Sequence, residues 1–123
     1  MATVLIVDDY PAIRTAIRAR FASCNGLEVC GEAVDGMDAI DKAKELRPDL
    51  ILLDMAMPRM NGIEAASVLK GLLPEVRIVA FTMYSEALRD SLAAAVGIDA
   101  VLAKPEGIGK LVECVRGLLQ RPS

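Results

Sequence analysis

The sequence predicts an α/β protein built as a doubly wound parallel sheet of five strands, each followed by a helix. Strand-like and helix-like segments alternate along the chain with a period of roughly twenty to twenty-five residues. Two of the expected strands contain the continuous apolar runs VLIV and LILL, which are typical of strands covered by helices on both faces. Right-handed crossovers between such strands give an open sheet, for which we expect the strand order 2-1-3-4-5.

Apolar periodicity and helix-breaking residues place each element. Strands are expected at 3–8, 27–33, 49–54, 77–81 and 100–103. A first helix is expected near Pro11, which suits a first helical turn, and it carries Ile13, Ala16, Ile17 and Phe21 on one side. Further helices are expected at 36–46, 62–73 and 86–96, the last two ended by Pro74 and Gly97. The final helix has the clearest apolar stripe, formed by Ile108, Leu111, Val112, Val115, Leu118 and Leu119.

Length and composition indicate one globular domain over residues 1–123. The chain has 123 residues, of which 54% are hydrophobic and 25% charged, and this balance argues against disorder. The net charge is −3 and no run of Lys or Arg stands out, so direct binding to nucleic acid is not expected. No apolar run approaches the roughly 18 residues of a membrane span, so no membrane association is expected.

The residue types that are rare or absent limit the chemistry. The chain has no histidine, which removes histidine-based catalysis and most transition-metal sites. Cys24, Cys30 and Cys114 are an odd number without metal-ligand spacing, and we expect reduced, buried thiols. Together with an N-terminus that lacks a basic region and a cleavage site, they favour a cytoplasmic location.

Polar side chains stand at the carboxyl ends of four apolar strands. Asp8 and Asp9 end the first, Asp54 the third, Thr82 the fourth, and Lys104 the fifth. Singly, each has an ordinary explanation: a helix cap for Asp8 or Asp9, a turn for Asp54, a strand or turn position for Thr82, a solvated loop for Lys104. Because ligands of open α/β sheets bind at this edge, the combination predicts one site.

The charges of this site predict a divalent cation and a phosphate. Three carboxylates about 5 Å apart repel by about 3 kcal/mol per pair at an effective dielectric near 20. Oxygen ligands without histidine or a nearby thiolate favour Mg²⁺, with Mn²⁺ as the alternative. Mg²⁺ is commonly held by one or two carboxylates together with phosphate oxygens. Lys104 and Thr82 then suit the phosphate, as a point charge and a hydroxyl donor.

The chain resembles, over essentially its whole length, the receiver domain of bacterial two-component response regulators, which has a flavodoxin-like fold. The motifs are VDD at 7–9, LLDMAMPRMNG at 52–62, FT at 81–82 and AKP at 103–105. The resemblance implies that Asp54 accepts a phosphoryl group from a sensor histidine kinase or a histidine phosphotransfer protein. It also implies that Asp9, an Asp54 oxygen and the Ala56 carbonyl coordinate Mg²⁺, and that Asp8 holds the metal through water.

The resemblance further implies a phosphate-binding set and an output surface. Thr82, the backbone N–H of Met83 and Lys104 would contact the phosphoryl oxygens, and the bond before Pro105 would be cis. Catalysis would be limited to the domain's own phosphorylation and dephosphorylation. Phosphorylation would change the surface of the fourth helix, fifth strand and fifth helix, and so control an unidentified downstream target or attached output domain, with a homodimer as one outcome.

The sequence departs from the family's usual pattern at two positions. Val101 stands where receivers commonly carry Tyr or Phe as a switch residue, so activation is expected to be weaker or to use other residues, with Tyr84 as a candidate. Ala56 offers no polar side chain at a position that influences how fast the phosphoryl group is lost.

Three other functions compete with the phosphoacceptor reading. A Mg²⁺-dependent phosphohydrolase with an aspartyl-phosphate intermediate would normally need a further acid or base and a substrate-binding cap. A flavin-binding protein would need a phosphate-binding loop after the first strand, where DDYPAIR places carboxylates instead. A phosphorylation-independent interaction module would not require the complete set of five polar residues.

Overall fold

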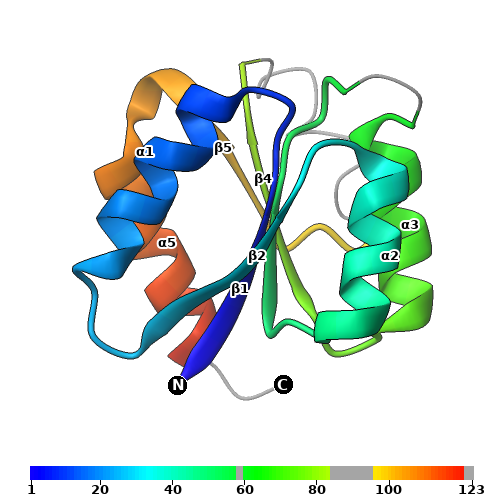
Figure 1. The fold of residues 1–123 in the computed structure, drawn as a ribbon, viewed down its shortest axis with the longest axis horizontal. Helices are drawn as coiled ribbons and strands as arrows, with labels where there is room; N and C mark the ends of the chain where they lie inside the picture. The colour runs from blue at the N-terminus through cyan, green and yellow to red at the C-terminus, as the bar shows by residue number, and fades with distance from the viewer. Residues whose placement is uncertain (58–59, 84–95, 121–123) are drawn as a thin grey trace.

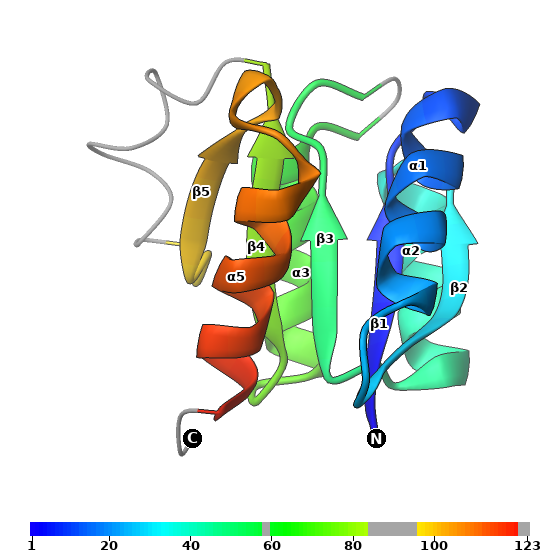
Figure 2. The ribbon, with the colours of Figure 1, turned by 90° about the vertical axis from the view of Figure 1, so that its left-hand side faces the viewer.

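The computed structural model describes residues 1–57, 60–83 and 96–120. Five parallel strands form one sheet in the order β2-β1-β3-β4-β5, which confirms the predicted topology (Figure 2). The strands are β1 (Ala2–Val7), β2 (Leu27–Ala33), β3 (Leu50–Leu53), β4 (Arg77–Thr82) and β5 (Ala100–Ala103). The fold is therefore the doubly wound one expected from the apolar runs.

Helices cover both faces of the sheet (Figure 1). The helices α1 (Pro11–Ala22) and α5 (Ile108–Gln120) lie on one face, and α2 (Gly36–Leu46) and α3 (Gly62–Leu72) lie on the other. The helix expected at 86–96 lies outside the described residues except for Val96, which is in a turn. A short 3₁₀ turn, Lys104–Glu106, connects β5 to α5.

Local hydrogen bonds decide where the elements begin and end. Asp35 and Asn61 cap α2 and α3 by accepting the backbone N–H groups of Asp38 and Glu64, at 2.9 and 3.0 Å. Leu73 caps α3 with its N–H bonded to the carbonyl of Leu69, but its φ of −130° and ψ of 80° are not helical, so this helix ends one residue earlier than predicted. Small shifts of this kind also separate the predicted from the observed strand ends.

The sheet separates two apolar cores. Along β1, Val4 and Ile6 pack in the core beneath α1 and α5, whereas Leu5 and Val7 pack in the core beneath α2 and α3. Successive strand residues point to opposite faces, so a continuous apolar run is what two covered faces require. Directly beyond the carboxyl ends of β1 and β3, the buried positions are occupied by Asp8 and Asp54.

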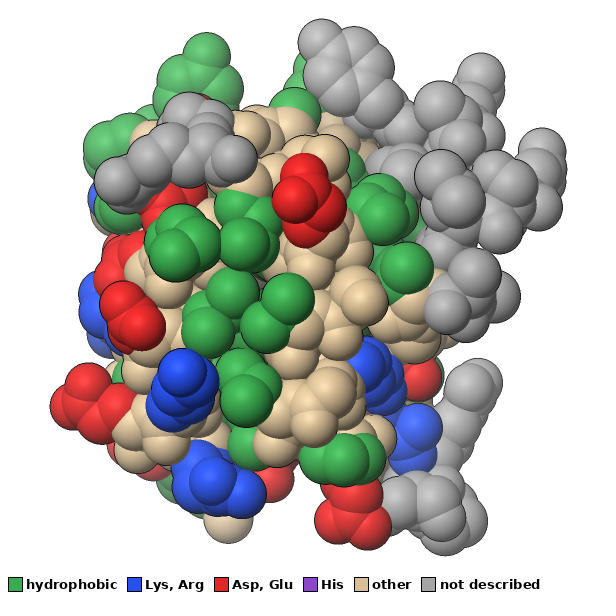
Figure 3. All heavy atoms as spheres, turned by 90° about the vertical axis from the view of Figure 1, so that its right-hand side faces the viewer, with side chains coloured by type: hydrophobic (Ala, Val, Ile, Leu, Met, Phe, Trp, Pro, Cys, Tyr) green, Lys and Arg blue, Asp and Glu red, His purple; other side chains and the backbone are tan. Residues whose placement is uncertain are grey.

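The outer surface of the α2 and α3 layer retains apolar side chains (Figure 3). The exposed large hydrophobic residues of α2, α3 and the turn before α2 are Val34, Met37, Val68 and Leu72. No helix in the described ranges is long and apolar enough to span a bilayer.

The three cysteine thiols are free, as predicted, but they are less buried than the sequence suggested. Cys24, Cys30 and Cys114 are all partly accessible. Cys30 lies in β2, which is at the edge of the sheet, and Cys24 lies in the loop after α1. At both places, neighbouring elements cover the side chain only in part. Burial raises the pKa of the Cys30 thiol, which keeps it protonated at neutral pH.

Candidate functional site

Strand register brings the carboxylates together. β1 and β3 are neighbours with Val7 opposite Leu53, so the residues that follow them, Asp8 and Asp54, emerge side by side. The N–H of Asp54 donates to the carbonyl of Val7 at 3.0 Å, and the N–H of Asp8 donates to that of Ala33 at 3.1 Å. Both aspartates are therefore fixed to the sheet immediately beyond the strand ends.

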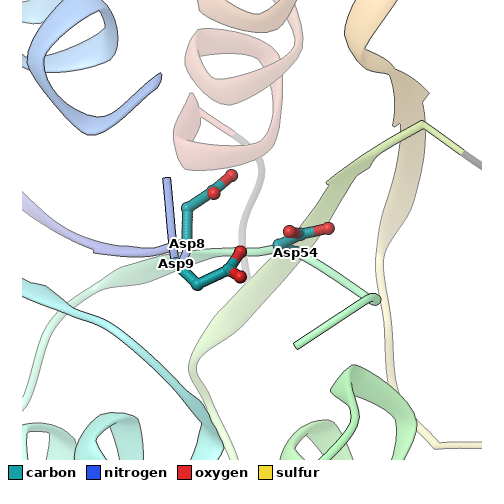
Figure 4. A group of neighbouring side chains, drawn as sticks. All are labelled: Asp8, Asp9 and Asp54. Carbon is teal, nitrogen blue, oxygen red and sulfur yellow. The ribbon is translucent and has the colours of Figure 1, made fainter. Parts of the chain in front are cut away.

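Asp8, Asp9 and Asp54 form the expected acidic cluster. One carboxylate oxygen from each lies within 4.8 Å of the other two (Figure 4). Asp8 and Asp54 are only 3% and 5% exposed, whereas Asp9 is exposed to solvent. The helix-cap explanation is wrong for both Asp8 and Asp9, because Tyr10 is the residue that precedes α1. Asp8 Oδ1 instead accepts the N–H of Tyr10 at 2.9 Å, which closes the turn between β1 and α1.

Lys104 reaches the same cluster from the end of β5. Its Nζ lies 2.8 Å from Asp8 Oδ2 and 3.4 Å from Asp54 Oδ2, and the side chain is 9% exposed. The expected cis bond before Pro105 is wrong, since the described residues contain no cis peptide bond. The ammonium reaches the carboxylates from the 3₁₀ turn at Lys104–Glu106, where Glu106 Oε2 accepts the N–H of Ala103 at 2.9 Å.

The cluster shifts the acidity of its members. Burial raises the pKa of Asp54, and the negative charge of Asp8 adds to this, while the N–H of Ala56 and the Lys104 ammonium act in the opposite direction. Burial alone would lower the pKa of Lys104, but its hydrogen bond to Asp8 and the charges of Asp54 and Asp8 raise it overall. Lys104 is therefore a permanent cation at neutral pH.

The remaining predicted residues lie at or just beyond the ends of β3 and β4. Thr82 is fully buried at the end of β4, where it pairs in register with Ala103 of β5. Met83 follows it and is 60% exposed. Ala56 is exposed, and its N–H donates to Asp54 Oδ1 at 3.2 Å. The carbonyl of Ala56 as a metal ligand and the N–H of Met83 as a phosphate donor stay predictions.

The donor set and its charge fit a hard divalent cation. Three carboxylates and one ammonium leave a net charge of −2 when all four groups are ionised. The offered ligand atoms are all carboxylate oxygens, as Mg²⁺ and Mn²⁺ prefer. Because Asp9 is exposed, a bound ion would keep access to water and to an incoming anion.

Sequence reasoning missed two residues that support this cluster. Arg14 Nη1 donates to the backbone carbonyl of Asp8 at 2.6 Å, and its Nε donates to Glu32 Oε1 at 2.9 Å. Arg14 lies one turn into α1, close to the carboxylates in sequence, so its position alone could have marked it. Nothing in the sequence pairs it with Glu32, which is 18 residues away on β2.

The family of the chain follows from comparison with known proteins. The family described as "Response regulator receiver domain" matches residues 4–116. The chain belongs to this family. It is 34% identical over 116 residues to the response regulator GacA of Pseudomonas viridiflava and 37% identical over 113 residues to the response regulator protein VraR of Staphylococcus saprophyticus. These alignments cover 94% and 92% of this chain but 54% of each relative, so the chain spans about half the length of the curated relatives it matches.

A solved structure gives the same assignment. A two-component response regulator of the LuxR family from Aurantimonas superposes with a TM-score of 0.90 at 28% identity, covering 97% of this chain and 85% of that one. The receiver-domain resemblance and the flavodoxin-like fold are thus confirmed. In this receiver, Val101 is half-buried and packs against the core beneath α2 and α3, while Tyr84 lies outside the described residues.

Proposed function

We propose that this receiver domain is a phosphoacceptor switch in which Asp54 takes a phosphoryl group with the help of Mg²⁺. The observation that carries the proposal is the grouping of Asp8, Asp9 and Asp54 within 4.8 Å, with Lys104 as the counter-charge. A bound Mg²⁺ would neutralise charge on the transferring phosphoryl group. Asp9, Asp54 and the Ala56 carbonyl would hold it directly, and Asp8 would hold it through water.

Asp54 is the proposed nucleophile. One of its carboxylate oxygens attacks the phosphorus of a partner's phosphohistidine, so that a P–O bond forms as the P–N bond breaks. The bonding pair returns to the imidazole nitrogen, and the product is an aspartyl phosphate. The N–H of Ala56 already binds Asp54 Oδ1, which fixes the rotation of the carboxylate and leaves the other oxygen beside Lys104.

Lys104 and Thr82 are the proposed phosphate ligands. Phosphoryl transfer depends mainly on in-line positioning and on neutralising charge as it spreads over the phosphoryl oxygens. Lys104 supplies a permanent positive charge 3.4 Å from Asp54, and the Thr82 hydroxyl and Met83 N–H supply donors at the end of the next strand. The new bonds would bias the segments after β4 and β5 between two conformations.

The proposed partners follow from the family. The phosphoryl donor is a sensor histidine kinase or a histidine phosphotransfer protein. The downstream target is a partner protein or an attached output domain, controlled through the surface of β5, α5 and the segment between β4 and β5. A LuxR-family regulator among the similar structures favours an attached output domain of that class. A homodimer formed on phosphorylation is a further proposed outcome.

The proposal is tested by intact mass after incubation with acetyl phosphate. We expect one phosphoryl adduct that requires Mg²⁺, is abolished by EDTA and is absent from the Asp54→Asn variant. An adduct on Asp54→Asn would place the acceptor elsewhere. If the wild type forms no adduct with Mg²⁺ or with EDTA, the phosphoacceptor function is refuted and a phosphorylation-independent interaction module becomes the supported function. Release of phosphate from a phosphate monoester with many turnovers would instead support the phosphohydrolase.

A further inference from the structure

Asp8 is held at four points, and one of them comes from a residue with no assigned part in the chemistry. Its N–H bonds to Ala33, its Oδ1 accepts the N–H of Tyr10, and its Oδ2 pairs with Lys104. Its backbone carbonyl accepts Nη1 of Arg14 at 2.6 Å. This last bond fixes the peptide plane between Asp8 and Asp9.

That peptide plane sets the position of Asp9. Asp9 is the exposed member of the acidic cluster, so its carboxylate depends on the backbone before it for its direction. A rotation of the Asp8–Asp9 peptide would redirect the backbone that carries the Asp9 carboxylate, whereas the Asp8 side chain stays held by its bonds to Tyr10 and Lys104. Groups that orient metal ligands without touching the metal typically change metal affinity by about 10- to 100-fold when removed.

Arg14 is itself held in one orientation. Its Nε donates to Glu32 Oε1 at 2.9 Å, and its side chain is 15% exposed. Glu32 lies on β2, the strand beside β1. The guanidinium therefore connects β2 to the loop that follows β1. A planar guanidinium can make both bonds at once with fixed geometry, which a lysine ammonium cannot do in the same way.

Arg18 provides a matched control within the same helix. Its Nε donates to the other oxygen of Glu32 at 2.6 Å, and its side chain is 48% exposed. Within the described part of the chain, Arg18 makes no hydrogen bond or ion pair with Asp8. Removing Arg14 or Arg18 therefore changes the net charge equally and breaks one bond to Glu32 in each case. Only the loss of Arg14 releases the Asp8 carbonyl.

We propose that Arg14 is a positioning residue for the metal site, which acts by anchoring the Asp8–Asp9 peptide to Glu32 of β2. This inference rests on the proposed binding of a divalent cation by the three carboxylates. Arg14 touches neither the cation nor the phosphoryl group. Its effect reaches them through the direction of the Asp9 carboxylate.

The test is Mn²⁺ binding without any phosphoryl donor, measured from the electron paramagnetic resonance signal of free Mn²⁺. We expect Arg14→Ala to raise the Mn²⁺ dissociation constant by about tenfold. Arg18→Ala, an exposed ion-pair partner, should change it by less than about twofold. Thermal unfolding of each variant, followed by circular dichroism, reports its folding. Equal dissociation constants for Arg14→Ala and Arg18→Ala would overturn the proposal, because a charge effect alone would then explain both.

Conservative variants keep the test decisive if Arg14→Ala does not fold. Arg14→Lys retains the charge but not the bridging geometry, so it should bind Mn²⁺ several-fold more weakly than Arg18→Lys. Equal affinities of the two lysine variants would overturn the proposal.

The same titration separates this proposal from the proposed function. A wild type that binds Mn²⁺ but forms no phosphoryl adduct would refute the phosphoacceptor function, and the variants would still decide the role of Arg14. A wild type that binds no Mn²⁺ would overturn the role of Arg14, since no metal site would exist to be positioned.

Discussion

The clearest energetic consequence of the acidic cluster is that removing one carboxylate should stabilise the metal-free protein. We consider Asp54→Asn, which keeps the shape of the side chain and removes its charge. Asp54 is 5% exposed, so its charge interacts with its neighbours through protein more than through water. Its pKa is raised, first by burial and then by Asp8 against the opposing effects of Ala56 and Lys104. This direction shows that the folded protein disfavours the charged form.

The size of the effect follows from the distances. At the 4.8 Å limit of the cluster, Asp8 and Asp9 each repel Asp54 by about 3.5 kcal/mol at an effective dielectric of 20. Lys104 at 3.4 Å attracts Asp54 by about 5 kcal/mol on the same scale. Repulsion exceeds attraction by about 2 kcal/mol, and the exposure of Asp9 to water reduces this. We therefore expect Asp54→Asn to raise the free energy of unfolding by about 1 to 2 kcal/mol.

Urea unfolding at neutral pH measures this gain, in EDTA and again in saturating Mg²⁺. For an m-value of about 2 kcal/mol per molar, the midpoint in EDTA should rise by about 0.5 to 1 M. Mg²⁺ should stabilise the wild type more than Asp54→Asn, because the wild type offers one more carboxylate, so the difference should shrink or reverse. Asp41→Asn, on the exposed side of α2, removes the same charge away from the cluster and serves as the control.

Two results would refute this reasoning. If Asp54→Asn leaves the midpoint in EDTA unchanged or lowers it, the attraction of Lys104 outweighs the repulsion. If Asp41→Asn gives the same gain, the effect comes from the overall charge of the chain and not from the cluster.

Three further predictions address the core, the phosphoryl lifetime and pH. Leu69→Ala, at a fully buried position of α3, should lower the free energy of unfolding by about 2 to 4 kcal/mol in urea, and a loss below about 1 kcal/mol would contradict the packing described. Ala56→Asn should speed dephosphorylation several-fold, because an amide beside the acceptor can orient an attacking water; equal decay of the adduct by mass would refute this. Burial would raise the pKa of Glu32, but hydrogen bonds from Arg18 and Arg14 outweigh burial and lower this pKa. The ion pairs of Glu32 therefore stabilise the fold above its ordinary pKa of 4.5, and this stabilisation is lost as the pH falls below 4.5. The stability advantage of wild type over Glu32→Gln should therefore shrink on acidification, and an advantage independent of pH would argue against it.

The sheet and the acidic cluster were predictable because both depend on the order of elements. VLIV and LILL are typical of strands with two covered faces, and parallel strands bring their carboxyl ends to one edge. Asp8 and Asp54 had to meet once β1 and β3 were neighbours, and Lys104 had to approach from β5. No side-chain geometry was needed for this conclusion.

The features that were missed depend on side-chain geometry. β3 begins one residue later than expected, and the residue before it, Asp49, accepts the N–H of Thr3 with its carboxylate at 2.8 Å, a bond between residues 46 positions apart. The link from Arg14 to the Asp8 carbonyl likewise depends on one rotamer and on Glu32 from another strand. Patterns of apolar residues contain no information about either bond.

The way Asp8 is held has a consequence for the proposed switch. Lys104 is shared between Asp8 and Asp54, and a phosphoryl group on Asp54 would add further negative charge on one side only. Lys104 would then move toward Asp54. Asp8 would keep its bonds to Tyr10 and Arg14, so the loop after β1 would stay in place while the 3₁₀ turn at Lys104–Glu106 moves. In the proposed switch, the anchored loop would be the fixed side of the site, and the segment leading into α5 would be the side that transmits the change.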